Sequence, residues 1–501
     1  MRVRVSSALR RLTSTMYESG RRGGAGLRVF AVWIAAVALA GLQCGCSGGK
    51  RETSPPSTSR PTKRAASPAA MEKIRAGAEE TNLIVIVLDA ARADHCGAYG
   101  YQRDTTPNID ALFAESIVFE QAYTQAPNTK ASIASLFTSQ SPTTHGVIGM
   151  TVALPPSTPT LPQVLSENGF RTVCLSANPF LSSEFGFERG FDEFQDVFRE
   201  VNLPANELGS VPAELLGKAA TSWFQEHAEE RFFVYLHFLE PHDPYTPPEP
   251  FASRYRGDTR LTKMMAAYDG NLAYVDSVVG EVLSALERLG LVDKSVIVLM
   301  SDHGEAFGEH GRLLHSDTIY EETAHIPLAI YLREACGVAP GQRSGIISTI
   351  DLMPTLLDMF GIEPPPTMQG RSELGLLASE GSGQRLYAVA RSRGRDETGG
   401  LKRPEEVIYA LIAERYTLML GDKGKRVELY DRERDPGQKD NMAEESETLV
   451  AELMGSFEEW AETQPTRPVV LPGGEVRASE SPEVEMSDKT RDHLKALGNL
   501  K

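Results

Sequence analysis

Residues 83–88 read LIVIVL, an uninterrupted apolar and largely β-branched run that ends at Asp89. A strand that is buried on both faces of a parallel sheet has this pattern, because neither face meets water. Similar runs recur in "FRTVCLSAN", "RFFVYLHFLEPHDPY", "KSVIVLMSDHGEAFGEHG" and "HIPLAIYL", and helical patterns such as "TLPQVLSENG" separate them. This alternation predicts an α/β fold with a large, mostly parallel sheet flanked by helices.

Three of these strands end in polar side chains. Asp89 ends the first, Glu240 and His242 end another, and Asp302 and His303 follow the apolar run "VIVLM". In open α/β sheets, ligands bind outside the carboxyl ends of the strands. We therefore expect one site, assembled from segments that lie far apart in the sequence.

The stretch "SDHGEAFGEHGRLLH", residues 301–315, is unusually dense in possible metal ligands. Its carboxylates and imidazoles suit Ca²⁺, Mn²⁺ or Zn²⁺, depending on their geometry. Beside Asp302 and His303, we interpret Asp89 as a metal ligand rather than as the N-cap of the next helix. His310 is a candidate for substrate binding, and His315 is a candidate for assisting the leaving group.

A second polar patch is "HFLEPHDPYTPP", residues 237–248. A histidine here can contact a leaving-group oxygen, donate a proton or bind a second metal. We take His237 as a substrate-binding candidate, the alternative being a core histidine bonded to the backbone. His242 is a catalytic candidate, and Glu240, His242 and His315 could instead hold a second metal.

The hydroxyl of Thr129 stands at the start of a predicted helix, "TKASIASLFT", whose apolar residues have helical spacing. A threonine there is an ordinary helix cap. The same position offers free N–H groups and partial positive charge to an oxyanion. Next to a divalent cation, the hydroxyl can act as a nucleophile. Lys130 adds a cation beside it and is a substrate-binding candidate.

The first 46 residues look like an export leader. Seven arginines precede an apolar run from Val29 to Leu42, which is short for a membrane span but suits a signal peptide. "LQCGCSGGK" follows and resembles a bacterial lipoprotein site, with a plain signal or a retained anchor as alternatives. Residues 47–80, rich in Ser, Pro, Thr, Lys and Arg, predict a disordered tether. We expect an exported protein, periplasmic or at the cell surface, tethered to a membrane through its N-terminus.

The whole chain has a net charge of −17, and the part beyond the tether is more acidic still, because the first 80 residues carry more Lys and Arg than acids. An acidic body argues against nucleic acid as a partner. It leaves room for a phosphate or sulfate site, which needs only local positive charge or a metal. The cysteines past the leader, Cys96, Cys174 and Cys336, predict buried thiols rather than disulfides or zinc ligands.

A domain boundary is expected near residue 365, at the end of a catalytic domain over 81–365. Beyond it, "EVIYALIAE", "YTLML" and "RVELYD" predict a small antiparallel sheet. With a helix over 444–463, they would form a smaller C-terminal α+β subdomain over 366–463. Residues 464–501 are expected to be an irregular tail with a short helix in "DKTRDHLKALG".

From about Asn82 to about Asn441, the sequence resembles the sulfatase family within the alkaline phosphatase superfamily. The landmarks are "NLIVIVLDAARADHCGAYGY", "TTPNIDALF", "ASLFTSQSPTTHGV", "FFVYLHFLEPHDPY", "SDHGEAFGEHG", "YEETAHIPLAIYL", "STIDLMPTLLDMFGI" and "ELYDRERDP". The resemblance implies a large mixed sheet with a smaller C-terminal sheet domain. It also implies a divalent metal at Asp89, Asp302 and His303, with Thr129 beside it. Ca²⁺ or Mn²⁺ is favoured, and Zn²⁺ or Mg²⁺ is the alternative.

The chain departs from this family at the nucleophile. Sulfatases carry a Cys or Ser that becomes formylglycine, with Pro two residues on and Arg four residues on, where this chain has Thr129, Ala131 and Ile133. The family's Lys-x-His element is also absent, and Asn178 in "LSANPF" is the polar substitute and a substrate-binding candidate. Threonine at the nucleophile position resembles lipoteichoic acid synthases, phosphoethanolamine transferases and nucleotide phosphodiesterases.

A threonine ester must be displaced in line by water or a second acceptor, as in metal-dependent phosphoryl transfer. We therefore expect an exported, metal-dependent hydrolase or transferase of phosphate or sulfate esters, with phosphorus favoured. The substrate would be a small-molecule, glycan or lipid-headgroup ester. One alternative is an arylsulfatase-like sulfuric ester hydrolase without formylglycine. The other is a non-catalytic binding lipoprotein with the sulfatase fold.

Overall fold

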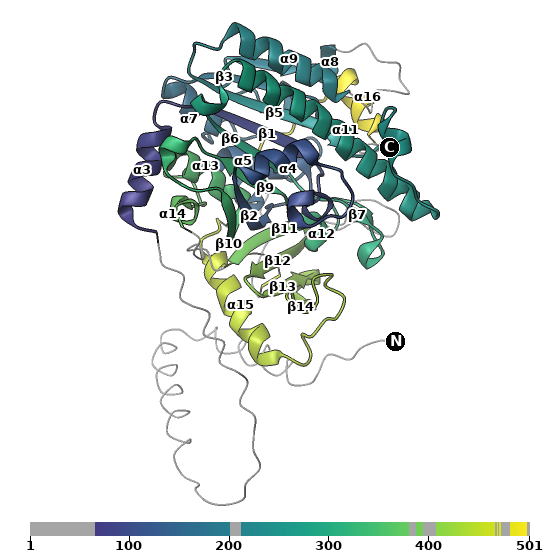
Figure 1. Ribbon diagram of the computed structural model, residues 1–501. Coiled ribbons are helices and arrows are strands. Elements are labelled where there is room, and N and C mark those ends of the chain that lie inside the picture. Colours follow the sequence, from purple (N-terminus) through teal and green to yellow (C-terminus); the bar gives the residue numbers. More distant parts are fainter. Residues whose placement is uncertain are drawn as a thin grey trace, which may run out of the picture. The chain divides into compact units, whose positions relative to one another are not determined.

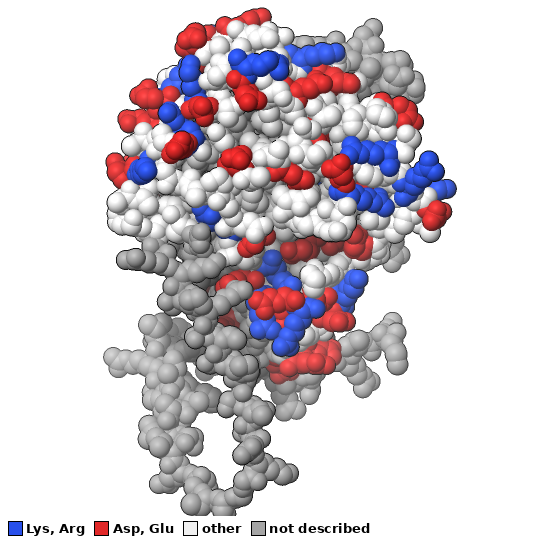
Figure 2. All heavy atoms as spheres, in the orientation of Figure 1, with Lys and Arg blue, Asp and Glu red and all other residues white. Residues whose placement is uncertain are grey.

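The computed structural model describes residues 66–200, 212–379, 387–393, 407–465, 468, 470–471 and 481–497. The predicted leader and the first part of the tether lie outside these residues. Within them, no helix combines the length and apolarity that a membrane crossing requires. On the face shown in Figure 2, acidic and basic side chains are interspersed.

An eight-stranded sheet forms the centre of the fold (Figure 1), in the order β10-β2-β9-β6-β1-β5-β3-β4. Neighbouring strands are parallel, except that β9 runs antiparallel to both β2 and β6. The predicted α/β fold with a mostly parallel sheet is therefore confirmed. The strands are β1 (Asn82–Asp89), β2 (Ile117–Tyr123), β3 (Arg171–Ser176), β4 (Glu193–Asp196), β5 (Phe232–Pro241), β6 (Ser295–Ser301), β9 (Leu328–Tyr331) and β10 (Gly341–Ser348).

Helices cover both faces of this sheet, which explains the continuous apolar run of β1. Its alternate side chains enter two separate core clusters, Val85 and Val87 in one and Ile84 and Ile86 in the other. The first face is covered by α5 (Thr129–Thr138), α7 (Leu161–Glu167) and α13 (Thr349–Met359). The second is covered by α4 (Pro107–Ala114), α9 (Ala213–Glu226) and α11 (Arg260–Arg288).

Shorter elements connect these layers. They are the helices α6 (Pro142–His145), α8 (Val197–Glu200), α10 (Phe251–Arg254), α12 (Glu321–Ala324) and α14 (Leu374–Leu377), and a small hairpin of β7 (Ala306–Phe307) and β8 (Leu313–Leu314). Cys96, Cys174 and Cys336 are buried free thiols, as predicted.

A second, antiparallel sheet follows in the order β11-β12-β13-β14. One face packs against α15 (Glu447–Glu462) through residues such as Leu418 and Phe457. The other face packs against the edge of the large sheet, where Ile412 meets Tyr123 and Ile346. The predicted smaller C-terminal subdomain is therefore present. Its strands are β11 (Tyr387–Arg393), β12 (Val407–Ala413), β13 (Tyr416–Gly421) and β14 (Arg426–Asp431).

The structure differs from the predicted domain boundaries, or adds to them, at three places. Residues 68–78 form helix α3 (Pro68–Ala78) with Ile74 and Ala78 buried, so the prediction of a disordered tether is wrong there. Leu374 and Leu377 of α14 pack in the core of the large sheet, so the boundary near 365 is too early. The predicted helix in the tail is α16 (Asp488–Ala496), and residues before it pair with the main body at Val152.

Candidate active site

The carboxyl ends of two neighbouring strands bring three predicted metal ligands together. Asp89 ends β1, and Asp302 and His303 directly follow β6, which pairs with β1 in parallel. The side chains of all three are fully buried. One ligand atom from each lies within 4.8 Å of the other two. Two segments more than 200 residues apart in the chain therefore form one cluster.

Hydrogen bonds hold part of each side chain in this cluster and leave one possible ligand atom of each side chain without a hydrogen bond to backbone. Asp302 Oδ1 accepts from the backbone N–H groups of Ala90 at 3.1 Å and His303 at 2.9 Å. His303 Nδ1 donates to the Gly304 carbonyl at 2.9 Å, which leaves the Nε2 lone pair 3.4 Å from Asp302 Oδ2. Asp89 Oδ1 and Asp302 Oδ2 are buried without a hydrogen-bond partner.

Two buried carboxylates with unpaired oxygens are costly unless a cation compensates them. Carboxylate oxygens with one neutral imidazole, oriented through its other nitrogen, are a donor set for a divalent cation. The described residues therefore fit a metal at Asp89, Asp302 and His303. Ala90 supports this arrangement with a left-handed φ of 60°, an uncommon conformation that aims its N–H at Asp302.

The hydroxyl of Thr129 lies against the cluster. Its Oγ1 is 3.4 Å from Asp89 Oδ2 and 3.5 Å from His303 Nε2. The N-cap of α5 is Asn128, whose Oδ1 accepts from the backbone N–H of Ala131 at 3.1 Å. The alternative interpretation of Thr129 as the helix cap is therefore wrong, because the preceding residue has that role. Thr129 is the first residue inside the helix.

Asn178, which follows β3, also reaches the cluster. Its Nδ2 donates to Asp89 Oδ2 and lies 3.5 Å from Thr129 Oγ1. Its Oδ1 accepts from the backbone N–H of Phe180 at 2.8 Å, which fixes the amide orientation. The amide N–H group is thus directed at the site, as expected of the polar substitute in "LSANPF".

His237 lies in a strand, as expected, but its partners differ from those of either predicted role. It is fully buried in β5, with Nε2 3.4 Å from Asp89 Oδ2 and Nδ1 2.9 Å from the Tyr235 hydroxyl. Both ring nitrogens are occupied, so neither a substrate contact nor a backbone-bonded core histidine describes it. Carboxylate oxygens only accept, so His237 Nε2–H donates to Asp89, and Nδ1 forms its hydrogen bond with the Tyr235 hydroxyl.

His242 and His315 flank the cluster as a pair. Their ring centroids are 4.9 Å apart, and the His315 ring lies 4.4 Å from that of His303. His242 Nδ1 donates to the Asp243 carbonyl, so its Nε2 stays available. Burial opposes charge on His242, but the carboxylates of Asp89 and Glu305 outweigh it and raise its pKa. The structure thus brings both catalytic candidates to the site.

Glu305 is a functional residue to which the sequence pattern assigned no role. Its Oε1 accepts from His315 Nδ1 at 3.1 Å and its Oε2 from the Tyr245 hydroxyl at 2.8 Å. Burial lowers the pKa of His315 despite this carboxylate. The spacing "DHGE" places Glu305 two residues after His303, which was the available signal. Only the fold shows that it orients His315.

A second metal at Glu240, His242 and His315 has no geometric support. Among the described residues, the cluster of Asp89, Asp302 and His303 is the one group that could hold a metal. Glu240 instead accepts from the backbone N–H of Ala213 at 3.2 Å. Burial raises the pKa of Glu240 to about 8.

Two substrate-binding candidates lie elsewhere. Lys130 Nζ donates to the Met150 carbonyl at 2.6 Å and lies 3.9 Å from the centre of the Phe185 ring, and burial lowers its pKa. It therefore turns away from Thr129, because side chains that are adjacent in a helix do not share a face.

His310 also has a structural role. Its Nδ1 is 2.9 Å from Glu322 Oε1, its Nε2 is 3.0 Å from the Gln438 carbonyl, and its ring stacks on Tyr320. It joins the metal-site segment to the smaller subdomain and does not face the cluster.

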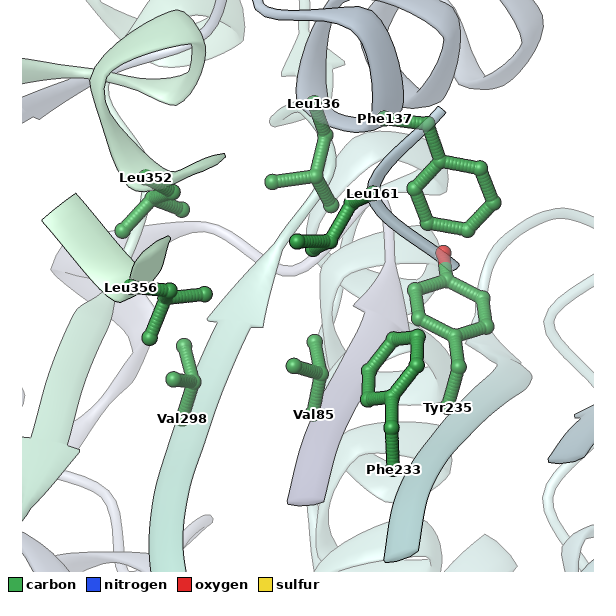
Figure 3. Close-up of a pocket in the computed structure, with 9 residues that line it drawn as sticks. All are labelled: Val85, Leu136, Phe137, Leu161, Phe233, Tyr235, Val298, Leu352 and Leu356. Atoms are coloured by element: carbon green, nitrogen blue, oxygen red, sulfur yellow. The ribbon is translucent and has the colours of Figure 1, made fainter. Parts of the chain in front are cut away.

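A void beneath α5 belongs to the core rather than to the site (Figure 3). Figure 3 shows Leu136 and Phe137 of α5 facing Val85 and Phe233 of the sheet, with the Tyr235 ring at one side. The space does not hold a water-sized molecule. The void therefore offers no space for a substrate.

Comparisons with known proteins agree with this fold. Residues 81–362 match the family model described as "Sulfatase", and residues 308–462 match "N-sulphoglucosamine sulphohydrolase, C-terminal". An arylsulfatase of Clostridium perfringens is 24% identical over 451 residues, covering 73% of this chain and 91% of that protein. A Delta 4,5-hexuronate-2-O-sulfatase of Bacteroides thetaiotaomicron is 23% identical over 422 residues, covering 73% and 85%. The solved phosphonate monoester hydrolase of Agrobacterium radiobacter has a TM-score of 0.67 at 19% identity, covering 79% of this chain and 100% of that one.

Proposed function

The chain belongs to the sulfatase family of ester hydrolases, and from this premise we propose that it cleaves phosphate esters with Thr129 as the nucleophile. The proposal rests on the position of Thr129 Oγ1, which lies 3.4 Å from Asp89 Oδ2 and 3.5 Å from His303 Nε2. Because Asn128 caps the helix, the hydroxyl has no structural duty that would explain this contact.

Asp89, Asp302 and His303 would hold a divalent cation, with Ca²⁺ or Mn²⁺ favoured by the carboxylates and Zn²⁺ or Mg²⁺ as the alternative. Such a cation supplies Lewis-acid polarisation of the ester and lowers the pKa of a neighbouring hydroxyl. The Tyr235–His237 pair orients Asp89, and the Gly304 carbonyl orients His303, so both ligands are preorganised.

The remaining residues of the site each have a role in an in-line displacement at phosphorus. Thr129 Oγ1 releases its proton to solvent and forms a bond to phosphorus, while the bond from phosphorus to the leaving oxygen breaks. Asn178 Nδ2 lies 3.5 Å from Thr129 Oγ1, so this amide and the N-terminus of α5 would face the non-bridging oxygens of the bound ester. His242 or His315 supplies the proton that the leaving oxygen needs. Water then attacks phosphorus, the bond to Thr129 breaks, and the threonine oxygen regains a proton.

Phosphorus is favoured over sulfur by what surrounds Thr129. A formylglycine hydrate can eliminate sulfate from its own adduct, whereas a threonine ester must be displaced at the central atom. Ile133, at the position where sulfatases carry an arginine, is fully buried in the core of the large sheet. No guanidinium therefore reaches the nucleophile from this turn of α5.

Sulfate ester hydrolysis is the second candidate function, and the names of the relatives favour it. The two relatives from Clostridium perfringens and Bacteroides thetaiotaomicron are sulfatases, the second one acting on a hexuronate. The solved phosphonate monoester hydrolase favours phosphorus instead. The proposed substrate is a small-molecule, glycan or lipid-headgroup ester.

The test is a side-by-side assay of 4-nitrophenyl phosphate, bis(4-nitrophenyl) phosphate and 4-nitrophenyl sulfate with Mn²⁺, Ca²⁺ or Zn²⁺. Wild type, Thr129→Ala and the control Thr138→Ala, at the other end of α5, are compared. Phosphate ester turnover that is lost only in Thr129→Ala supports the proposal. Sulfate turnover that survives Thr129→Ala overturns it. Metal binding without turnover of any ester favours a binding protein.

We also propose that the protein is exported and tethered to a membrane through its N-terminal leader, as a lipoprotein. The support is the run from Val29 to Leu42 followed by Cys44 and Cys46. Fractionation of cells that express wild type or the Cys44→Ser, Cys46→Ser double variant tests this. Release of the double variant from the membrane fraction is expected, and unchanged membrane association contradicts lipidation.

A further inference from the structure

Exposed leucines gather beside the active site. The described residues include four large apolar side chains that are more than a third exposed, Leu215, Leu261, Leu313 and Leu314. Leu313 (51% exposed) and Leu314 (36%) form β8 of the small hairpin. Leu261 (38%), in the first turn of α11, comes within 3.3 Å of where a Cβ on Gly308 would stand, at the hairpin turn. Exposed apolar side chains that are grouped mark ligand-binding or interaction sites.

The backbone of the hairpin adds an independent observation. Leu314 has φ 66° and Ser316 has φ 82°, so both neighbours of His315 adopt the left-handed conformation. That conformation is unfavourable for leucine, whose Cβ crowds the backbone and which lacks the local hydrogen bonds of Asn or Asp. An exposed side chain at a strained position gains nothing for folding. Such outliers collect at functional sites, where other contacts hold them.

The hairpin is continuous with the catalytic machinery. β7 begins three residues after His303, and β8 is followed directly by His315. Glu305 holds His315 Nδ1 at 3.1 Å, and the His315 ring lies 4.4 Å from that of His303. The leucines therefore lie on the side of the site where His242 and His315 would meet the leaving group. Figure 1 shows this hairpin, labelled β7, beside the end of α11.

We propose that Leu261, Leu313 and Leu314 bind an apolar leaving group, an alkyl chain or an aromatic ring, of the ester that reacts at Thr129. The proposal rests on the proposed function for the position of the reacting ester. It adds the substrate class, an ester whose alcohol portion is apolar. A sugar would leave these three side chains in contact with polar groups, without the gain that apolar burial gives.

The kinetic test compares methyl phosphate with octyl phosphate below its micelle concentration, and methyl sulfate with octyl sulfate. Wild type, Leu313→Ser and Leu261→Ser are measured, with Leu215→Ser as the matched control, because Leu215 is also exposed (36%) and lies on α9 rather than on the hairpin or α11. In the two test variants, kcat/KM for the octyl ester should fall about tenfold, the equivalent of roughly two buried methylenes. The loss for the methyl ester should be much smaller. An equal loss for both esters, or none, overturns the proposal.

A binding measurement separates this proposal from the nucleophile assignment. With Thr129→Ala, calorimetry should show tighter binding of octyl phosphate than of methyl phosphate, even when turnover is absent. The added Leu313→Ser change should remove the difference. Equal affinity for the two phosphates overturns the proposal. Leucine-dependent binding to phosphatidylcholine vesicles without an octyl preference overturns it as well, in favour of a membrane-docking surface.

Discussion

Thr129 Oγ1 lies 3.4 Å from Asp89 Oδ2, although the two residues are 40 positions apart in the chain. The contact exists because β1 ends and α5 begins at the same edge of the large sheet. Asn128 caps α5, so the Thr129 hydroxyl is free to face the metal-ligand cluster. Nucleophile and helix cap are thus adjacent residues with separable roles.

That separation predicts opposite effects for the two residues. Thr129→Ala should lower turnover by on the order of 10³-fold or more, because the nucleophile is removed, with little change in the free energy of unfolding. Thr129→Ser should keep measurable activity. Asn128→Ala should lower the free energy of unfolding by about 1 kcal/mol, because the N-cap bond is lost. Kinetics and urea unfolding of all three variants check this, and a large stability loss in Thr129→Ala would contradict the assignment.

The chain from Tyr235 through His237 to Asp89 predicts an effect on metal affinity. Tyr235→Phe preserves ring packing but removes the hydroxyl that bonds His237 Nδ1 and holds the ring in place. Metal affinity, measured by calorimetry, should fall about tenfold, as for other groups that orient a metal ligand. Tyr99→Phe is the control, because the half-buried Tyr99 donates its hydroxyl to the Phe119 carbonyl, away from the cluster. Equal affinity in wild type and Tyr235→Phe would show that Asp89 needs no such support.

Metal removal should destabilise the fold. Without a cation, the unpaired oxygens of Asp89 and Asp302 face each other in a buried space. At a free metal concentration one hundred times the dissociation constant, the free energy of unfolding should rise by about 2.7 kcal/mol. Thermal unfolding with EDTA and with Mn²⁺ or Ca²⁺ measures the gain. His303→Ala should remove most of it, and a gain that persists in this variant would place the metal elsewhere.

The sequence predicts those parts of the fold that follow from local pattern. The run at 83–88 needs two apolar faces, so it specifies a buried parallel strand, and the polar residues after such strands must meet at one edge. The pattern of residues alone therefore places Asp89, Asp302 and His303 together. Asn178 could be found as well, because it follows a strand of the same sheet.

The local pattern could not predict the direction in which a side chain points or its partners from distant parts of the chain. Lys130 follows Thr129, but one step along a helix turns the side chain by about 100°. Its ammonium group therefore bonds the Met150 carbonyl and lies over the Phe185 ring instead of facing the site. His310 lies in the richest ligand stretch, yet Glu322 and Gln438 bind it. Residues 68–78 look like a linker by composition, and only the packing of Ile74 makes them a helix of the fold.

His145 predicts a defined acid sensitivity. Its Nε2 bonds Ser135 Oγ at 3.0 Å and its Nδ1 accepts from the backbone N–H of Val147 at 3.0 Å, so the folded state holds the neutral ring. Burial, with the charge of Arg391, lowers the pKa of His145 to about 3. The unfolded chain takes up a proton near pH 6.5 and the folded chain does not. The stability from this group is therefore complete above pH 6.5 and is lost as the pH falls toward 3.

The size of this effect is about 1.4 kcal/mol per pH unit below pH 6.5. Urea unfolding of wild type and His145→Gln at several pH values isolates it, because the other titrating groups are common to both proteins. The variant should be the less stable one at pH 7.5, and its deficit should shrink as the pH falls. A deficit that does not change between pH 7.5 and pH 4.5 would show that His145 is protonated in the fold.

The left-handed backbone at Leu314 predicts that replacing this leucine stabilises the fold but weakens the preference for apolar substrates. Leu314→Asn should raise the free energy of unfolding by on the order of 1 kcal/mol, because Asn tolerates a φ of 66° better than Leu does. Leu313→Asn is the matched control, because Leu313 is exposed and is not among the residues with positive φ, so its stability should change by less than about 0.5 kcal/mol. Both variants should lose the preference for octyl over methyl esters. Thermal unfolding and kcat/KM ratios measure the two effects separately. Unchanged stability in Leu314→Asn would mean that the hairpin relaxes without strain, and function would then no longer be needed to explain the conformation.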